Sequence, residues 1–173
     1  MNKWAVAAIL VVCKSVMLLE GAAPNGNSRE VQNQGNAQES VGSYDTPLTE
    51  KDKKNINYVI DTLSSKSMFS LLAVKSDLEA AGESTQHVNP LTHLQYIFSN
   101  PELKAKTKDI GNVPWNRYVG DFGDALQKAK DKGEINEEIL KKFAKKVNVD
   151  YDILKPLYEK GDWKKFMNTL RDS

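Results

Sequence analysis

Residues 114–132 read PWNRYVGDFGDALQKAKDK and carry the clearest structural pattern in the chain. Apolar positions recur at offsets of 3, 4, 7, 11 and 14 from the first of them: Trp115, Tyr118, Val119, Phe122, Leu126 and Ala129. Only a helix brings all six positions to one side. Gly120 and Gly123 interrupt this helix, and each costs up to about 1 kcal/mol relative to alanine. We therefore expect the two glycines to mark close packing against a neighbouring element.

Helix start signals precede this stretch. Thr49 followed by Asp52 has the spacing of a capping box, and Asn89-Pro90 and Asn100-Pro101 each place a capping residue before a first-turn proline. Apolar residues at helical spacing follow each signal. Residues 48–173 show no sustained alternation of polar and β-branched residues. The sequence therefore predicts a compact all-α domain of seven or eight short helices.

One of these helices is expected to begin at about Ser67. Its buried side is predicted to carry four apolar residues: Met68, Leu71, Leu72 and Leu78. Gly82 is expected to end it in the left-handed conformation, which glycine adopts without steric cost.

Three short helices are predicted after residue 132. The second is expected to begin after Asp150 and to bend near Pro156, and the third to be capped by Asp162. The residues expected to face inward are, helix by helix, Ile139, Leu140, Phe143 and Val147, then Ile153, Leu154, Leu157 and Tyr158, then Trp163, Phe166, Met167 and Leu170.

The N-terminal segment, residues 1–23, has the pattern of a secretory signal peptide. Lys3 precedes an apolar stretch from Trp4 to Leu19, and small residues close the segment. The stretch is shorter than the roughly 20 residues that span a bilayer, and Lys14 lies inside it. The sequence predicts a secreted or periplasmic protein, with a retained N-terminal membrane anchor as the alternative. Cys13 lacks small residues directly before it, so lipidation there is not expected.

Residues 24–47 are rich in Asn, Gln, Gly and Ser and are expected to form a disordered linker, because they cannot bury enough apolar surface to offset the entropy of ordering. The globular domain is then residues 48–173. Cys13 is the only cysteine, so this domain must rest on hydrophobic packing without disulfides. A hydrophobic fraction of 40% and a charged fraction of 27% exclude a polytopic membrane protein.

Two carboxylates, Asp121 and Asp124, are the candidates for catalysis. They are three residues apart on one flank of the predicted helix, as a pair for acid–base chemistry could be, and they support the alternative of a small hydrolase-like enzyme. Such chemistry needs a deep pocket and a shifted pKa. No phosphate-binding loop or nucleophile elbow is present in the sequence, and His87 and His93 do not share a helical face. No metal site, cofactor or catalytic activity is therefore expected.

Residues 139–158 have the apolar spacing of a helix-turn-helix unit, which makes nucleic-acid binding a second alternative. The second helix of this unit carries Asp150, Asp152 and Pro156, although base readout needs basic and polar side chains. Residues 48–173 contain 21 Lys and Arg against 19 Asp and Glu, which gives no strong electrostatic footprint. Nucleic acid is therefore not an expected partner.

The candidate binding residues are two aromatic side chains and four lysines: Trp115, Tyr118, Lys141, Lys142, Lys145 and Lys146. The aromatic residues would anchor a partner only if they are exposed. The lysines form either a solvated face paired with Glu137 and Glu138, or a surface for weak association with an anionic membrane. The sequence thus predicts an exported, non-enzymatic helical protein that binds another protein or a surface, and it leaves the oligomeric state open.

Overall fold

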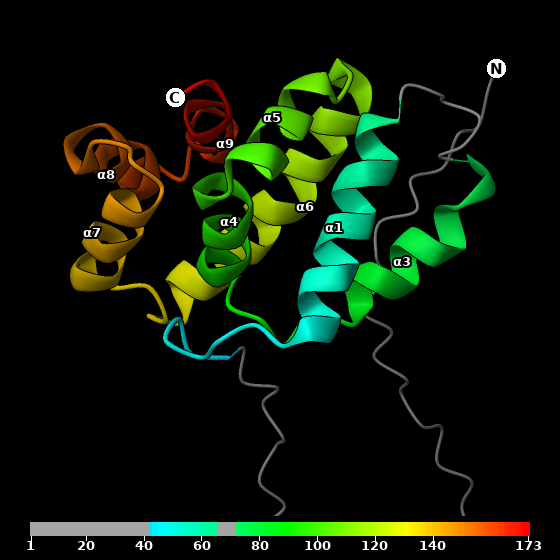
Figure 1. Ribbon diagram of the computed structural model, residues 1–173. Helices are drawn as coiled ribbons and strands as arrows, with labels where there is room; N and C mark the ends of the chain where they lie inside the picture. The colour runs from blue at the N-terminus through cyan, green and yellow to red at the C-terminus, as the bar shows by residue number, and fades with distance from the viewer. Residues whose placement is uncertain (1–41, 66–71) are drawn as a thin grey trace, which may run out of the picture. The chain divides into compact units, whose positions relative to one another are not determined.

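A computed structural model describes residues 42–65 and 72–173 (Figure 1), which form eight α-helices and no strand. The helices are α1 (Glu50–Ser64), α3 (Lys75–Glu83), α4 (Pro90–Ser99), α5 (Pro101–Asp109), α6 (Asn112–Asp131), α7 (Glu137–Lys146), α8 (Tyr151–Lys160) and α9 (Trp163–Asp172). The prediction of an all-α domain of short helices is confirmed. The predicted signal peptide, most of the predicted linker, and Met68 and Leu71 lie outside the described residues.

The predicted helix starts are found where the capping residues placed them. The Thr49 side chain accepts a hydrogen bond from the Asp52 backbone N–H (3.1 Å), and the Asp52 carboxylate accepts one from the Thr49 N–H (2.9 Å). Asn89 and Asn100 cap α4 and α5 with a proline directly after each. These local signals fix where the helices begin, because each capping residue supplies a hydrogen bond to the first turn of the helix that follows it.

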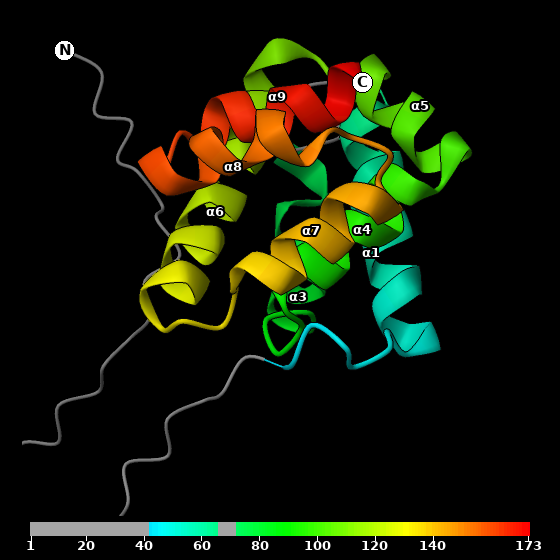
Figure 2. The same ribbon diagram turned by 90° about the vertical axis from the view of Figure 1, so that its left-hand side faces the viewer.

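The central helix of the domain is α4, which packs against α5, α6 and α7. On one side of it, α1 packs against α3 and α5 (Figure 1). On the other side, α9 packs against α5, α6 and α8, and Figure 2 shows α8 and α9 lying side by side. The largest fully buried side chains are Phe143, Phe166, Ile56, Ile60, Leu91, Leu94, Ile97, Leu126, Leu140, Leu154, Met167 and Leu170.

The face of α6 that the sequence predicts to be buried does enter the core. Trp115, Val119 and Leu126 are buried, and Phe122 is half-buried. Of the two glycines expected to pack closely against a neighbouring element, only Gly123 does so. A Cβ at Gly123 would lie 3.1 Å from Cβ of Trp163, whereas a Cβ at Gly120 would meet no atom within 4 Å.

Replacing these two glycines by alanine is therefore expected to have opposite effects. Gly120→Ala should stabilise the domain by up to about 1 kcal/mol, because an exposed helix position gains propensity. Gly123→Ala should destabilise it by about 1 kcal/mol or more, because Cβ of Trp163 is fixed to the backbone and cannot move away. Urea unfolding followed by circular dichroism measures both variants. Equal stabilisation by both would contradict the close packing of α6 on Trp163.

The prediction for the second helix is wrong in two respects. Leu72 is 72% exposed rather than buried. Gly82 lies inside α3, which Ser84 caps, and within residues 42–65 and 72–173 the glycines with a left-handed backbone are Gly133 and Gly161. Leu72 is exposed because this part of the chain lies at the edge of the domain, where α3 packs against α1 and buries only Ala81.

The ordered domain begins before residue 48. The Gly42 N–H donates to the His87 carbonyl, and the Tyr44 hydroxyl donates to the Gln95 side chain. The Thr92 hydroxyl donates to the Tyr44 carbonyl at 2.9 Å, and the ring of Tyr44 is buried. Residues 42–47, at the end of the segment predicted to be a linker, therefore contact the domain through one aromatic ring and three hydrogen bonds.

No helix within residues 42–65 and 72–173 is both long enough and apolar enough to cross a bilayer.

Candidate interaction groove

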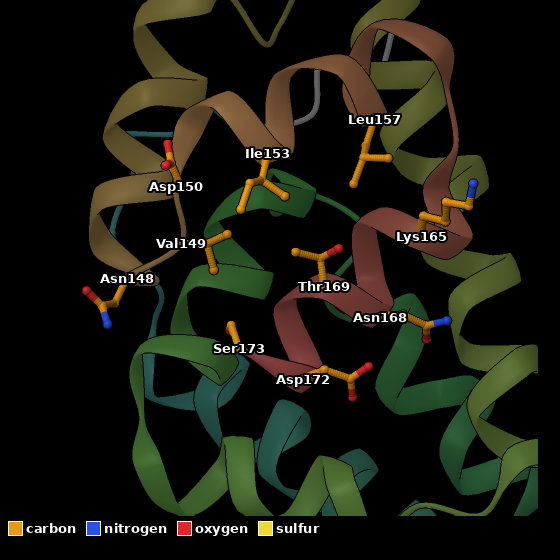
Figure 3. Close-up of a pocket in the computed structure, with 10 residues that line it drawn as sticks. All are labelled: Asn148, Val149, Asp150, Ile153, Leu157, Lys165, Asn168, Thr169, Asp172 and Ser173. Carbon is orange, nitrogen blue, oxygen red and sulfur yellow. The ribbon is translucent and has the colours of Figure 1, made fainter.

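A groove of about 630 Å³ lies between α8 and α9 (Figure 3). Its lining residues are Asn148, Val149, Asp150, Ile153, Leu157, Lys165, Asn168, Thr169, Asp172 and Ser173. Apolar side chains from the start and middle of α8 form one wall, and polar side chains of α9 form the other. Ile153 is 51% exposed, so a large apolar side chain stands at the mouth of the groove.

Two tight turns hold the groove in shape. Asn148 has a left-handed backbone (φ 56°) and ends α7, after which the Asp150 carboxylate caps α8 by accepting from the Asp152 N–H (2.9 Å). Gly161 has φ 66° and turns the chain from α8 into α9, which Asp162 caps. Asn148 thus lies in the turn from α7 to α8 with a conformation that non-glycine residues rarely adopt, and Gly161 lies in the turn from α8 to α9.

The α9 wall is anchored from beneath. Phe166 of α9 is fully buried, stacks with Phe143 of α7 (6.1 Å between ring centroids), and meets Trp163 edge to face at 5.9 Å. The indole N–H of Trp115 donates to Oδ1 of Asn168 at 2.8 Å and so orients a side chain that lines the groove. Core packing thus holds the α9 wall of the groove in place.

Opposite charges lie at the two ends of the groove. Figure 3 shows Asp150 beside Ile153 at one end and Lys165 beyond Leu157 at the other. Lys165 also lies 3.6 Å from the Asp162 carboxylate, and its side chain is 74% exposed. An exposed pair of this kind contributes less than about 1 kcal/mol, so Lys165 can exchange Asp162 for another acidic partner at little cost.

The structure places both aromatic binding candidates in the core. Trp115 is 2% exposed and Tyr118 is 7% exposed, so neither forms part of a surface. The Arg171 guanidinium covers the Trp115 ring at 4.5 Å. Burial raises the pKa of the Tyr118 hydroxyl above its usual range. These side chains face inward because α6 lies between α4 and α9, and Trp115 acts on the groove only through Asn168.

The four lysine candidates are all exposed on α7, and they divide into two pairs. Lys141 and Lys142 lie 2.7 Å and 3.0 Å from Glu137 and Glu138, one turn earlier, as the solvated-face interpretation predicts. Lys145 and Lys146 form no ion pair within residues 42–65 and 72–173.

The two carboxylate candidates are exposed on α6. Asp124 lines an open depression of about 490 Å³ that also includes Trp163 and Lys164, but Asp121 does not line it. Partial burial and the neighbouring Asp124 raise the pKa of Asp121, and Arg117 opposes that shift. The structure therefore does not bring the two carboxylates together on one cavity.

The predicted helix-turn-helix spacing corresponds to α7, the turn of residues 147–150, and α8, and the two helices pack together. The outward residues of α8 are mixed in character: Asp152, Ile153, Pro156, Glu159 and Lys160 are exposed. Pro156 lies inside the helix, as expected near a bend.

The histidines occupy different environments. The His87 side chain is exposed and lies 3.5 Å from the Asp52 carboxylate. His93 is buried against the ring of Phe122, with 4.7 Å between centroids. Within the described residues, no group of three His, Cys, Asp or Glu side chains is arranged to hold a metal ion.

Residues 48–173 match the model of the family of unknown function DUF8085. The chain belongs to this family. The matched residues coincide with the predicted domain. An uncharacterized lipoprotein of Chlamydia muridarum is 21% identical over 76% of the chain, and a probable lipoprotein of Chlamydia pneumoniae is 21% identical over 77%. A probable lipoprotein of Chlamydia trachomatis serovar D is 20% identical over 74% of the chain.

The chain spans about three fifths of the length of these curated relatives, with 61%, 62% and 59% of each covered. No solved structure matches this member of the DUF8085 family.

Sequence reasoning missed the groove because it assigned Ile153 to the inward face of α8. Four apolar residues in that helix, Ile153, Leu154, Leu157 and Tyr158, were all expected to face the core. Only Leu154 is fully buried. A signal was present, since residues 153 and 154 are consecutive and lie about 100° apart on a helix, so that one of them faces outward when the other is central in the core.

Proposed function

We propose that this protein is an exported helical module that acts by binding another protein in the α8–α9 groove. The observation that carries the proposal is Ile153, which is 51% exposed and lines the open groove between α8 and α9. An apolar side chain at a rigid concave surface is typical of a binding site.

The groove specifies the chemistry of its partner. Val149, Ile153 and Leu157 take an apolar side chain, which supplies affinity by excluding water. Asp150 at one end takes a basic group, and Lys165 at the other takes an acidic one. The fitting partner is a protein surface with an apolar anchor between a positive and a negative group, and the charges set its orientation.

A photo-crosslinking amino acid at position 153 tests the proposal in the native cell envelope fraction. We expect one dominant protein adduct at this position. The same label at Val113, which is 71% exposed on α6 and is not one of the residues that line the groove, should yield none. The reversal Lys165→Glu should suppress the adduct at least about tenfold, because it places a like charge against the acidic group of the partner.

The matched control is Lys164→Glu, which makes the same charge change one residue away and outside the groove. It should leave the adduct unchanged. An adduct that forms equally in the Lys165→Glu and Lys164→Glu variants would overturn binding in the groove. Loss of all adducts, together with co-sedimentation on phosphatidylglycerol vesicles that Lys145→Glu and Lys146→Glu abolish, would point instead to the anionic membrane surface.

Export is part of the proposal. It is supported by the signal peptide pattern of residues 1–23 and by the relatives, whose names describe lipoproteins. Cys13 follows Val11 and Val12 and precedes Lys14, so the sequence still argues against lipidation at that residue. Cell fractionation with N-terminal sequencing is expected to find a mature chain beginning near Pro24 in a secreted or periplasmic fraction. An intact N-terminus in the cytoplasmic fraction would contradict export.

A further inference from the structure

The surface of α8 is complementary to itself. Ile153 and Leu157 are one turn apart in the middle of the helix and both line the groove. Asp150 caps the N-terminal end of the helix, and the exposed Lys160 is its last residue. Lys165 lies beyond Leu157 on the far wall (Figure 3). Asp150 therefore lies at one end of the apolar strip and Lys165 at the other, where Glu159 is 3.8 Å from Lys155 and Asp162 is 3.6 Å from Lys165.

Two copies of the chain related by a two-fold axis between Ile153 and Leu157 would match this pattern of charges. It places Ile153 of each copy opposite Leu157 of the other, and the two α8 helices then run antiparallel. The same rotation brings Asp150 of each copy to the end of the groove where Lys165 of the other copy lies. One self-complementary patch thus makes every contact twice, as a two-fold interface requires.

We propose that the partner in the α8–α9 groove is a second copy of this chain. The inference rests on the proposed function, because it names the occupant of the same groove. The second copy meets the specification derived above, with an apolar anchor flanked by one basic and one acidic group. The antiparallel arrangement also sets the N-terminus of each α8 beside the C-terminus of the other, which is the favourable alignment of helix dipoles.

The small size of the proposed contact predicts a weak dimer. A contact made by one helix and one open groove is expected at the small end of specific interfaces, below about 1,200 Å² in total. We therefore expect a dissociation constant between about 10 µM and about 1 mM, where self-association depends on local concentration.

Sedimentation velocity of the purified protein between about 1 µM and 1 mM tests the inference. The wild-type chain is expected to shift from monomer to dimer across this range. Ile153→Glu should raise the dissociation constant at least about tenfold, because it places a charge in the apolar strip at both contacts. Lys165→Glu should also raise it about tenfold, because the new carboxylate faces Asp150 of the second copy.

Two further variants separate pairing from loss of folding. Lys164→Glu makes the same charge change outside the groove and should leave the dimer unchanged. Asp150→Asn retains a capping residue while it removes the charge. Combined with Lys165→Glu, it should restore most of the lost affinity, since the repulsion needs both carboxylates. A double variant as weak as Lys165→Glu alone would overturn the proposed pairing.

The crosslinking label at position 153 distinguishes the two proposals. An adduct of twice the chain mass supports the second copy. A monomer at every concentration, with an adduct to a different protein, overturns the second copy and leaves the proposed function standing. A monomer with no adduct overturns both. A dimer that Ile153→Glu leaves unchanged uses another surface and overturns the inference.

Discussion

Acidification toward pH 4 is expected to destabilise the domain by roughly 2 to 3 kcal/mol through one buried imidazole, His93. Burial lowers the pKa of His93 from its usual 6.5 to about 3, and the nearby Asp52 carboxylate offsets only part of that shift. The Nε2 atom is buried without a hydrogen-bond partner among the described residues, and the ring packs on Phe122. The folded protein therefore holds this imidazole neutral.

The sign of the pH dependence follows from the lowered pKa. In the unfolded chain the imidazole binds a proton below about pH 6.5, whereas in the folded chain it does so only near pH 3. Its contribution to stability is complete above pH 6.5 and is lost progressively between these two values. Protonation of the Asp52 carboxylate adds a further loss of stability at lower pH. Burial raises its pKa, but hydrogen bonds from Thr49 and the neighbouring histidines outweigh that effect and lower it overall.

Urea unfolding at a series of pH values measures this effect. His93→Leu removes the titrating group at similar volume and should flatten the free energy of unfolding between pH 6 and pH 4. His87→Leu is the matched control, because the His87 side chain is 64% exposed, and it should retain the pH dependence of the wild type. A wild-type stability that does not change between pH 6 and pH 4 would contradict the burial of His93.

Phe166→Ala is expected to destabilise the domain by about 3 to 5 kcal/mol, which is a large part of the 5 to 15 kcal/mol typical of a folded domain. The Phe166 side chain is fully buried and contacts the rings of Phe143 and Trp163. Truncation leaves a cavity where α9 meets α7 and α6. The loss of these ring contacts adds to the loss of buried area.

The same urea experiment measures the Phe166 variant. Val113→Ala is a suitable control, because Val113 is 71% exposed, and we expect a change within about 0.5 kcal/mol. The α8–α9 groove should also lose its shape in Phe166→Ala, so the crosslink at position 153 should weaken. A loss below about 1 kcal/mol would show that α9 does not pack on the core as described.

The local signals in the sequence predicted most of the helices and their starts. Thr49, Asn89, Asn100, Asp150 and Asp162 each cap the helix that was expected to follow them. A cap acts within one turn, through hydrogen bonds between residues two or three apart, so the sequence contains all the information that the cap requires. The buried stripe of α6 was predicted for the same reason, because its periodicity is a property of that segment alone.

The candidate site was predicted less well. Lys141 and Lys142 were correctly paired with glutamates one turn away, since such pairs are local. Trp115 and Tyr118 could be assigned to a surface or to the core only once the packing of α6 was known, because an apolar face does not reveal whether another element covers it. The groove itself depends on the distance between α8 and α9, which no single segment encodes.

The sequence by itself determined the helical class, the helix starts and the absence of disulfides in the domain, because each of these follows from residue type and short spacing. Tertiary structure alone decided which apolar residues remain exposed. Leu154 entered the core and its neighbour Ile153 did not, because the packing of α7 and α9 against α8 encloses Leu154 and leaves Ile153 at the open groove. Burial is a property of the whole packed domain, and the surface available for binding is what that packing leaves uncovered.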